Sequence, residues 1–231
     1  PTITVTLTVA STIRSLTLDE NLSVSGGLTI SHASAVHGVL ALSGSLAGSG
    51  DLLVTGTLNW TAGNAQSMAG TGKTTIDSAG NLNKSGQAVL ARNLDNFGTV
   101  TLTSGCPMSN AVLNNSGVFN WTLLAGSHEI STGAPGSAIN NDGTFIKTGN
   151  GAGVFTAFAS GQVAFNNTGT CTVEGGRLFI AIGSHTGAFH IQNSSRLYFE
   201  GFSHSLGPGS SISGLGTLFM GGGTGSPGLF T

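Results

Sequence analysis

Apolar residues occupy every second position along most of this chain. The alternation is clearest at residues 2–9, 21–25, 99–103 and 196–199. A period of two is typical of β-strands, because successive side chains point to opposite faces of a strand, whereas helices repeat every 3.6 residues. Short glycine-containing turns, such as the one at residues 48–50, separate the runs. The pattern therefore predicts an all-β protein made of many short, half-buried strands.

A four-residue phrase, Asn-Asn-x-Gly, recurs between an apolar residue and a β-forming run. It occurs at residues 113–119, 139–145 and 165–171, and a degenerate copy stands at 94–100. Gly117, Gly143 and Gly169 of the three full copies are evenly spaced, and Gly98 of the degenerate copy stands somewhat closer to Gly117. A period of roughly 20 to 50 residues is typical of solenoids and arrays. We therefore expect a β-solenoid, a single-stranded parallel β-helix whose coils lie one strand spacing apart.

Equivalent residues of successive coils stack in a solenoid, so the repeat predicts columns of identical side chains. Asparagines that point inward at a corner can bind turn amides and each other, and stacked phenylalanines can fill the core. A β-sandwich, which also consists of many short strands, has no reason to repeat this register. The predicted structural ladder consists of Asn114, Asn115, Asn140, Asn141, Asn166, Asn167, Phe119 and Phe145, with Cys171 in the phenylalanine column.

Weaker copies of a glycine-led strand extend the repeat toward both ends. They begin at Gly27, Gly50, Gly72, Gly187 and Gly216, and together with the central copies they follow one another at irregular intervals. This predicts one solenoid domain over residues 1–231, with roughly ten irregular coils and a length of about 45 to 50 Å. Less regular coils are expected over 1–92, the Asn-Asn-x-Gly coils over 93–173, and the C-terminal coils over 174–231.

Glycine-, threonine- and asparagine-rich phrases stand at residues 56–63, 201–206 and 209–214, alongside Asn-Asn-x-Gly. They resemble the repeats of large secreted or surface β-solenoid proteins of the adhesin-like and filament-forming kind. The resemblance covers most of the chain. It implies a right-handed β-helix with an extracellular structural or adhesive role, and it carries no catalytic residues over to this sequence.

Charged residues make up only 7% of the chain, and its formal net charge is -2. Nucleic-acid-binding proteins present clusters of basic residues to phosphates. Here the basic residues are scattered, with no run or stripe: Arg14, Lys73, Lys84, Arg92, Lys147, Arg177 and Arg196. We therefore expect no nucleic-acid partner. We expect no membrane span either, because the most apolar stretch, 154–165, is shorter than the roughly 20 residues that a spanning helix needs.

No cofactor and no metal is expected from the sequence. Residues 70–75 look like the end of a phosphate-binding loop, but the position that needs the motif's first glycine is Ser67, so a turn leading into a strand is expected. His185, His190 and His204 share the C-terminal region without ligand-like spacing. We expect these histidines at the surface or in loops.

The two cysteines, Cys106 and Cys171, are predicted to be free thiols. Cys171 stands in a core column and Cys106 on a turn. The spacing between them is two and a half times the interval from Gly117 to Gly143, which places the two on different sides of the stack.

A carbohydrate-binding or polysaccharide-cleaving β-helix with a site in a lateral groove is the main alternative function. Cleavage of a glycosidic bond generally needs two carboxylates several ångströms apart. The least unfavourable pair is Asp142 and Glu174, with Arg177 nearby. Because no clustered carboxylate pair stands out, we expect no enzyme.

Aromatic side chains are the candidates for glycan contact, and an aromatic row on one face would favour this alternative. The candidates are Trp60, Trp121 and Tyr198. Each lies in an alternation that could equally point it into the core. Trp121 shares its phase with Lys147 and Val173 of the following coils, a position of mixed character.

Seven Asn-x-Ser/Thr sequons occur in the chain. Asn114 and Asn166 belong to the predicted ladder and, if buried there, cannot be glycosylated. The better candidates for N-glycosylation, if the source glycosylates secreted proteins, are Asn21, Asn59, Asn83 and Asn193. Alternating threonines, as at residues 99–103, are similar to the hydroxyl arrays that order water. They do not repeat on every coil, so an ice-binding module is only the third alternative.

The preferred hypothesis is an extracellular structural protein: a β-solenoid stalk, adhesin module or filament subunit. Residues 2–9 form a long, uncharged first strand, and residues 221–231 are glycine-rich and uncharged. Neither end carries the signs of a cap, and open strand edges pair with other strands. We therefore expect end-to-end self-association or continuation in a longer chain, with glycans as further candidate partners.

Overall fold

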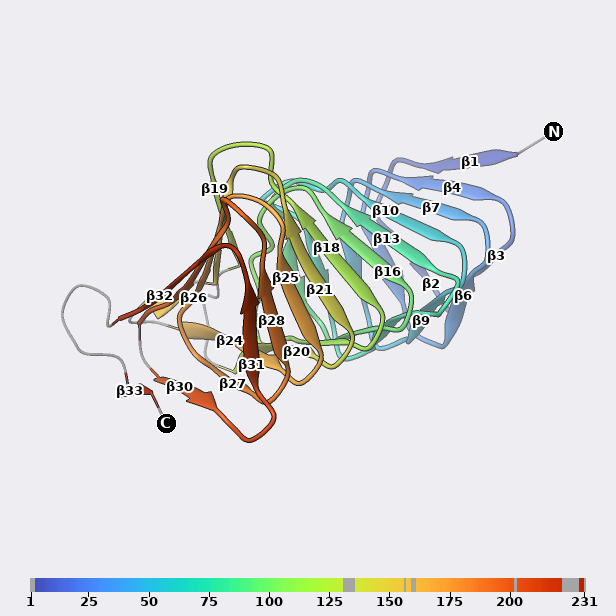
Figure 1. Ribbon diagram of the computed structural model, residues 1–231. Coiled ribbons are helices and arrows are strands. Elements are labelled where there is room, and N and C mark those ends of the chain that lie inside the picture. Colours follow the sequence, from blue (N-terminus) through green and yellow to red (C-terminus); the bar gives the residue numbers. More distant parts are fainter. Residues whose placement is uncertain are drawn as a thin grey trace.

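The computed structural model describes residues 3–130, 136–155, 157–158, 161–201, 203–221 and 229–230. Within these residues the protein is an all-β stack of coils without a helix, which confirms the predicted β-solenoid of about ten turns (Figure 1). Each coil passes along three sides of the stack, and parallel strand pairing joins each coil to the next. The two ends of the chain lie at opposite ends of the stack (Figure 1).

Two sheets, here called sheet A and sheet C, run the whole length of the stack. Sheet A contains β1 (Thr4–Leu7), β4 (Asn21–Val24), β7 (Val39–Leu42), β10 (Thr57–Trp60), β13 (Asn81–Lys84), β16 (Thr99–Leu102), β18 (Val118–Thr122), β21 (Thr144–Thr148), β25 (Thr170–Val173), β28 (Ala188–Ile191) and β31 (Ser211–Gly214). Sheet C contains β3 (Thr17–Leu18), β6 (Ser34–Val36), β9 (Leu52–Val54), β12 (Thr74–Ile76), β15 (Leu94–Asn96), β17 (Val112–Asn115), β20 (Ser137–Asn141), β24 (Gly161–Asn167), β27 (Gly183–His185), β30 (Ser203–Leu206) and β33 (Leu229–Phe230). An additional short strand, β23 (Ala157–Phe158), pairs antiparallel with β24.

The third side is built from two separate sheets. Sheet B serves the N-terminal coils and contains β2 (Ser11–Ile13), β5 (Leu28–Ile30), β8 (Leu46–Ala47), β11 (Ser67–Ala69) and β14 (Val89–Ala91). Sheet D serves the C-terminal coils and contains β19 (Ser127–Ile130), β22 (Ala152–Phe155), β26 (Arg177–Ile180), β29 (Arg196–Phe199) and β32 (Thr217–Met220). The coil between them has no strand on this side, and an isolated bridge joins its Met108 to Leu90. The third side therefore changes from sheet B to sheet D about halfway along the stack.

Glycines form a column at the corner where the chain passes from sheet C into sheet A. A Cβ atom on Gly117, Gly143, Gly169 or Gly187 would collide with the carbonyl oxygen of the glycine one coil earlier. These positions therefore need glycine because consecutive turns approach each other closely.

The weaker glycine-led copies do not all belong to this column, which corrects the expected coil lengths. Gly27 stands before β5 in sheet B, while Gly50 and Gly72 stand before β9 and β12 in sheet C. A glycine-led strand marks any corner of the coil, so spacings between different corners do not measure a coil. The register within one sheet does measure it. In sheet A, Thr4 pairs with Asn21 in an early, short coil, whereas Val118 pairs with Thr144 in a longer one.

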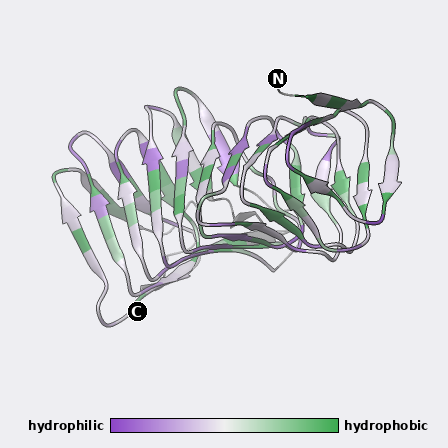
Figure 2. Ribbon diagram, turned by 90° about the vertical axis from the view of Figure 1, so that its right-hand side faces the viewer, coloured by the Kyte–Doolittle hydropathy of each residue, from purple (hydrophilic) through white to green (hydrophobic). Residues whose placement is uncertain are grey.

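Alternate residues of each strand point into the stack and form one continuous core. Figure 2 shows the alternation as green and pale or purple segments along the strands. The inner face of each sheet is covered by the other two sides across a thin interior, whereas the outer face carries the intermediate and exposed residues of the alternation. The core is therefore long and narrow.

Candidate functional site

Buried asparagines form an inner ladder along sheet C. The Nδ2 atoms of Asn96, Asn115 and Asn141 each donate to the Oδ1 atom of the asparagine one coil later, over 2.6, 2.6 and 2.7 Å, and Asn167 ends the ladder. Each Nδ2 also donates to a backbone carbonyl of the following turn, those of Val118, Thr144, Thr170 and Ala188. Asn96 was missed in the sequence, although the degenerate copy at 94–100 marks its position.

A second asparagine column, at Asn114, Asn140 and Asn166, lies on the outside of sheet C. Asn140 Nδ2 donates to Asn114 Oδ1 and Asn166 Nδ2 to Asn140 Oδ1, both over 2.9 Å. Asn114 Nδ2 in turn donates to Asp95, which pairs with Lys73 over 2.7 Å. Asn114 is exposed, so the condition under which a ladder asparagine could not be glycosylated is not met there. Adjacent strand residues face opposite sides, which separates this column from the inner ladder.

The phenylalanine column lies in the core. Phe119 and Phe145 stack with ring centroids 5.1 Å apart, and Cys171 follows them in register. The Cys171 and Cys106 thiols are both free and buried, and burial raises the pKa of each. A buried, protonated thiol is a small apolar side chain rather than a nucleophile.

The two tryptophans lie in the core, so of the two alternatives left open by the sequence the inward one holds and neither is a candidate for glycan contact. Trp60 and Trp121 are almost completely buried. Trp121 Nε1 donates to the carbonyl of Ser104 over 2.9 Å, and Trp121 stacks in register on Lys147. The alternation that placed both residues in strands could not tell which face was inside.

Three of the seven basic side chains are buried, which the sequence did not show. Lys147 Nζ donates to the carbonyls of Thr148, Gly149 and Gly175 over 2.9 to 3.0 Å, and burial lowers its pKa to about 8. Lys84 Nζ donates to Gly86 and Gly105 and lies 4.8 Å from the centroid of the Trp60 ring. Arg92 Nη2 donates to Gly50 over 2.8 Å. These cations bind turn carbonyls and add nothing to the surface charge.

Two of the three C-terminal histidines are buried, contrary to the expectation of surface positions. His185 and His204 stack with ring centroids 5.8 Å apart and with Nε2 of His185 3.5 Å from Nδ1 of His204. Burial, reinforced by the neighbouring His204, lowers the pKa of His185 to about 4. His190 is exposed on sheet A, 3.2 Å from Ser213. Within the described residues no three candidate ligands come together as a metal site.

The carboxylates considered for glycosidic cleavage are not brought together. Asp142 stands before β21 at one corner, and Glu174 follows β25 at the opposite corner of sheet A. They are separated by the length of a strand and its turn on neighbouring coils, which is about 20 Å at the rise of a β-strand. Arg177 begins β26 on another side of the coil. Residues 70–75 form a turn that leads into β12, as expected.

An aromatic row lies on the outer face of sheet D. Tyr198 stacks between Phe179 and Phe219, with ring centroids 4.2 and 4.4 Å apart and interplanar angles of 17° and 4°. Of these three residues only Tyr198 was a candidate from the sequence. The triplets Arg-Leu-Phe, Arg-Leu-Tyr and Thr-Leu-Phe at 177–179, 196–198 and 217–219 carry the signal that was missed.

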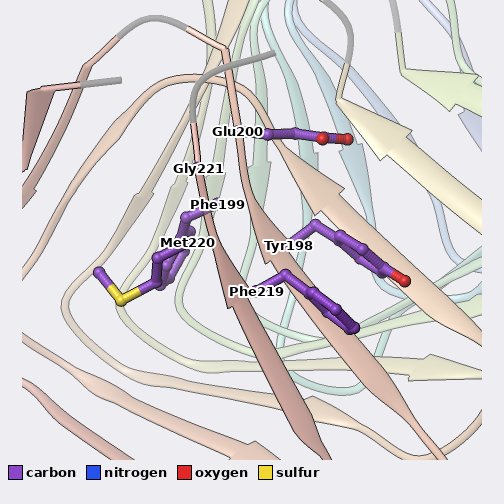
Figure 3. Close-up of a pocket in the computed structure, with 6 residues that line it drawn as sticks. All are labelled: Tyr198, Phe199, Glu200, Phe219, Met220 and Gly221. Atoms are coloured by element: carbon purple, nitrogen blue, oxygen red, sulfur yellow. The ribbon is translucent and has the colours of Figure 1, made fainter. Parts of the chain in front are cut away.

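A shallow pocket of about 250 Å³ lies at the C-terminal end of this row. It is lined by Tyr198, Phe199, Glu200, Phe219, Met220 and Gly221. Figure 3 shows the rings of Tyr198 and Phe219 parallel and pointing to one side, with Glu200 on that side, while Met220 points the other way. The pocket therefore joins the outer aromatic row to the open end of the core.

Core positions are uncovered at both ends of the stack. Val5 stacks in register on Leu22 and is 57% exposed. At the other end Met220 is 47% exposed, whereas Phe199, its partner one coil earlier, is fully buried. The strands β1, β2 and β3, and likewise β31, β32 and β33, are the last of their sheets and leave one backbone edge open in the described residues.

The sequons differ in exposure. Asn83 and Asn193 are exposed, and Asn21 and Asn59 are half-buried. Asn83 Nδ2 donates to Asn59 Oδ1 over 3.0 Å on the outer face of sheet A. Their glycosylation stays a prediction. The described part of the chain contains no helix that is long and apolar enough to cross a membrane.

Comparison of the chain with known protein families, curated proteins and solved structures finds no match.

Proposed function

We propose that the protein is an extracellular structural β-solenoid, a stalk or filament subunit whose copies stack end to end. The observation that carries this proposal is the exposure of core positions at both ends, where no described coil covers the inward side chains of Val5 and Met220. Exposed apolar residues and unpaired strand edges of this kind favour the addition of further strands. The resemblance of the repeats to adhesin-like proteins supports an extracellular location.

Sheets A and C reach both ends, so they can continue from one copy into the next. Stacking β31 on β1 and β33 on β3 would pair open edges and bury core side chains. The third side would join sheet D of one copy to sheet B of the next. One copy would add about 50 Å to the filament, as expected for the eleven strands of sheet A at the strand spacing.

Electron microscopy of negatively stained protein, combined with light scattering at several concentrations, tests the proposal. We expect filaments with a long-axis repeat of about 50 Å and an average mass that rises with concentration. A Val5→Lys variant places a charge in the end face and should leave single rods. Leu124→Lys is the matched control, because Leu124 is 81% exposed but lies away from the two end coils. Monomeric rods at every concentration would overturn end-to-end assembly.

A further inference from the structure

Two residue columns lie side by side on the outer face of sheet D. One is the aromatic row of Phe179, Tyr198 and Phe219. The other contains Arg177 and Arg196, which are direct register partners in β26 and β29. The two columns occupy alternate positions of each strand, so they face the same side. The fold thus places an apolar strip beside two cations that come from successive coils.

Arg177 and Arg196 are both exposed, and among the described residues the one ion pair, Lys73 with Asp95, involves neither of them. The same outer face also carries Glu129, which lies in the register column of Phe179 two strands away. The nearest carboxylates along the chain are Glu174 before β26 and Glu200 after β29. The row of aromatic residues separates Arg196 from Glu200 along β29. Like charges directly opposite each other on neighbouring strands destabilise a sheet, so an anion bound between them would relieve that repulsion.

The chemistry of the two columns suits one class of ligand. Guanidinium groups bind carboxylates in bidentate geometry. The rings of the aromatic row cover one another's faces, so their edges form an apolar strip on which a sugar ring can lie. A sugar ring is comparable in length to one strand spacing, so neighbouring uronate residues can meet neighbouring strands. Two exposed arginines are too few for the multiple phosphate contacts of a nucleic-acid site.

We infer that the outer face of sheet D binds a carboxylated polysaccharide, a chain of uronic acid residues, through Arg177, Arg196 and the aromatic row. This goes beyond the proposed structural role, because the site is on the flank and does not require end-to-end stacking. The arginines hold the carboxylates, and the exposed edges of the aromatic row support the sugar rings.

Isothermal titration with a galacturonate oligosaccharide tests the inference, with a neutral galactose oligosaccharide of the same length as the reference ligand. We expect the acidic ligand to bind, the neutral one to bind at least tenfold more weakly, and added salt to weaken the binding. The Arg177→Gln/Arg196→Gln variant should lose at least about tenfold in affinity. Arg14→Gln removes an exposed arginine near sheet B and should bind like the native chain.

Several results would overturn the inference. They are equal binding of the neutral and acidic ligands, native affinity in the double variant, or stronger binding to single-stranded DNA or to vesicles of anionic phospholipid. Arg196→Lys keeps the charge but loses bidentate geometry, and it should fall between the native chain and Arg196→Gln. Measuring in the Val5→Lys background keeps the result independent of filament formation. All variants lie on the surface, and their melting temperatures establish that they fold.

Discussion

The N-terminal and C-terminal halves of the stack fill equivalent inward positions with different side chains. One inward column of sheet A contains leucines at Leu22, Leu40 and Leu58 in its early coils, and Phe119 and Phe145 in later ones. The coil lengths vary in both halves: Thr57 pairs with Asn81 over a long interval, whereas Thr170 pairs with Ala188 over a short one. Larger core side chains thus appear in the second half without a steady change in coil length, and the third side changes from sheet B to sheet D.

The sharpest contrast lies in one inward column of sheet C. In the N-terminal half it is aliphatic, with Val36, Val54 and Ile76 in register. From Asn96 onward the same column is the inner asparagine ladder, and after Asn167 it reaches His185. The position is buried throughout, so burial alone does not select apolar residues. A buried amide is tolerated where the coils before and after it provide hydrogen-bond partners.

Breaking the ladder in its middle should have the largest effect. Asn141→Leu keeps the side-chain size but removes the acceptor of Asn115 and leaves the Oδ1 of Asn167 and the carbonyl of Thr170 without this donor. We expect the free energy of unfolding to fall by about 4 kcal/mol, because each unpaired buried polar group costs about 1 to 3 kcal/mol. Urea denaturation measures it.

The outer ladder supplies the matched control for this substitution. Asn140→Leu changes the neighbouring residue, whose hydrogen bonds lie on the solvent-facing side. Because water can replace these bonds, we expect a loss of less than about 1 kcal/mol. Equal losses for Asn140→Leu and Asn141→Leu would show that the inner ladder has no special role in stability.

Lowering the pH should destabilise the C-terminal half of the stack more than the N-terminal half, because the buried His185 lies in the C-terminal half. Its pKa is lowered from 6.5 to about 4 by burial and by His204, so below pH 6.5 the unfolded chain binds a proton that the folded chain excludes. The free energy of unfolding should therefore fall as the pH falls from 6.5 toward 4, by up to roughly 3 kcal/mol. Hydrogen exchange followed by mass spectrometry should show the C-terminal coils opening first.

His185→Leu removes the titrating imidazole and should therefore reduce this pH dependence. Leucine suits the site, because the next position of the column is Leu206. The control is His190→Leu, which removes an exposed histidine from the next strand along the chain, in sheet A, and should leave the dependence unchanged. A pH profile in which His185→Leu matches the native chain would contradict a role for His185.

Two substitutions that place an asparagine in the aliphatic half of the column should differ from each other in free energy of unfolding, and this is the smallest effect expected. Asn96 Oδ1 is buried and has no hydrogen-bond donor among the described residues. Ile76→Asn places an amide one coil before it, in the direction in which the ladder donates, whereas Val54→Asn places one between Val36 and Ile76. We expect Ile76→Asn to cost about 1 to 2 kcal/mol less than Val54→Asn.

Paired urea denaturation curves measure this difference. Ile76→Asn loses more apolar surface than Val54→Asn, so a smaller cost at position 76 can only come from the new hydrogen bond. Equal costs at the two positions would indicate that Asn96 does not accept a donor from the preceding coil.

Much of the fold could be predicted because the decisive signals are local and periodic. Alternation indicated strands, and the even spacing of identical phrases indicated stacking. The inner and outer asparagines could be grouped into columns from Asn114 and Asn115 onward, but not assigned to the inside or outside. The spacings between the weaker glycine-led copies gave wrong coil lengths, because glycines such as Gly27 and Gly98 stand at different corners of the coil.

The candidate site on sheet D could be predicted only in part. Tyr198 was recognised, but Phe179 and Phe219 were missed because the coils that carry them differ in length. Arg177 and Arg196 were counted among scattered charges for the same reason. The register between coils of different length depends on how many residues each turn contains, and the packing of the coils decides that number.

By itself the sequence determined the strand periodicity, the β-solenoid class and the repeated core phrase, because each of these depends on local patterns and their regular recurrence. Only the tertiary structure decided which face of each strand is inside. It buried Trp60, Trp121 and Lys147, and it assembled the aromatic and arginine columns on one outer face. The physical reason is that burial and cross-strand pairing depend on neighbours one coil away. Because the coils differ in length, those neighbours stand at no constant spacing in the sequence.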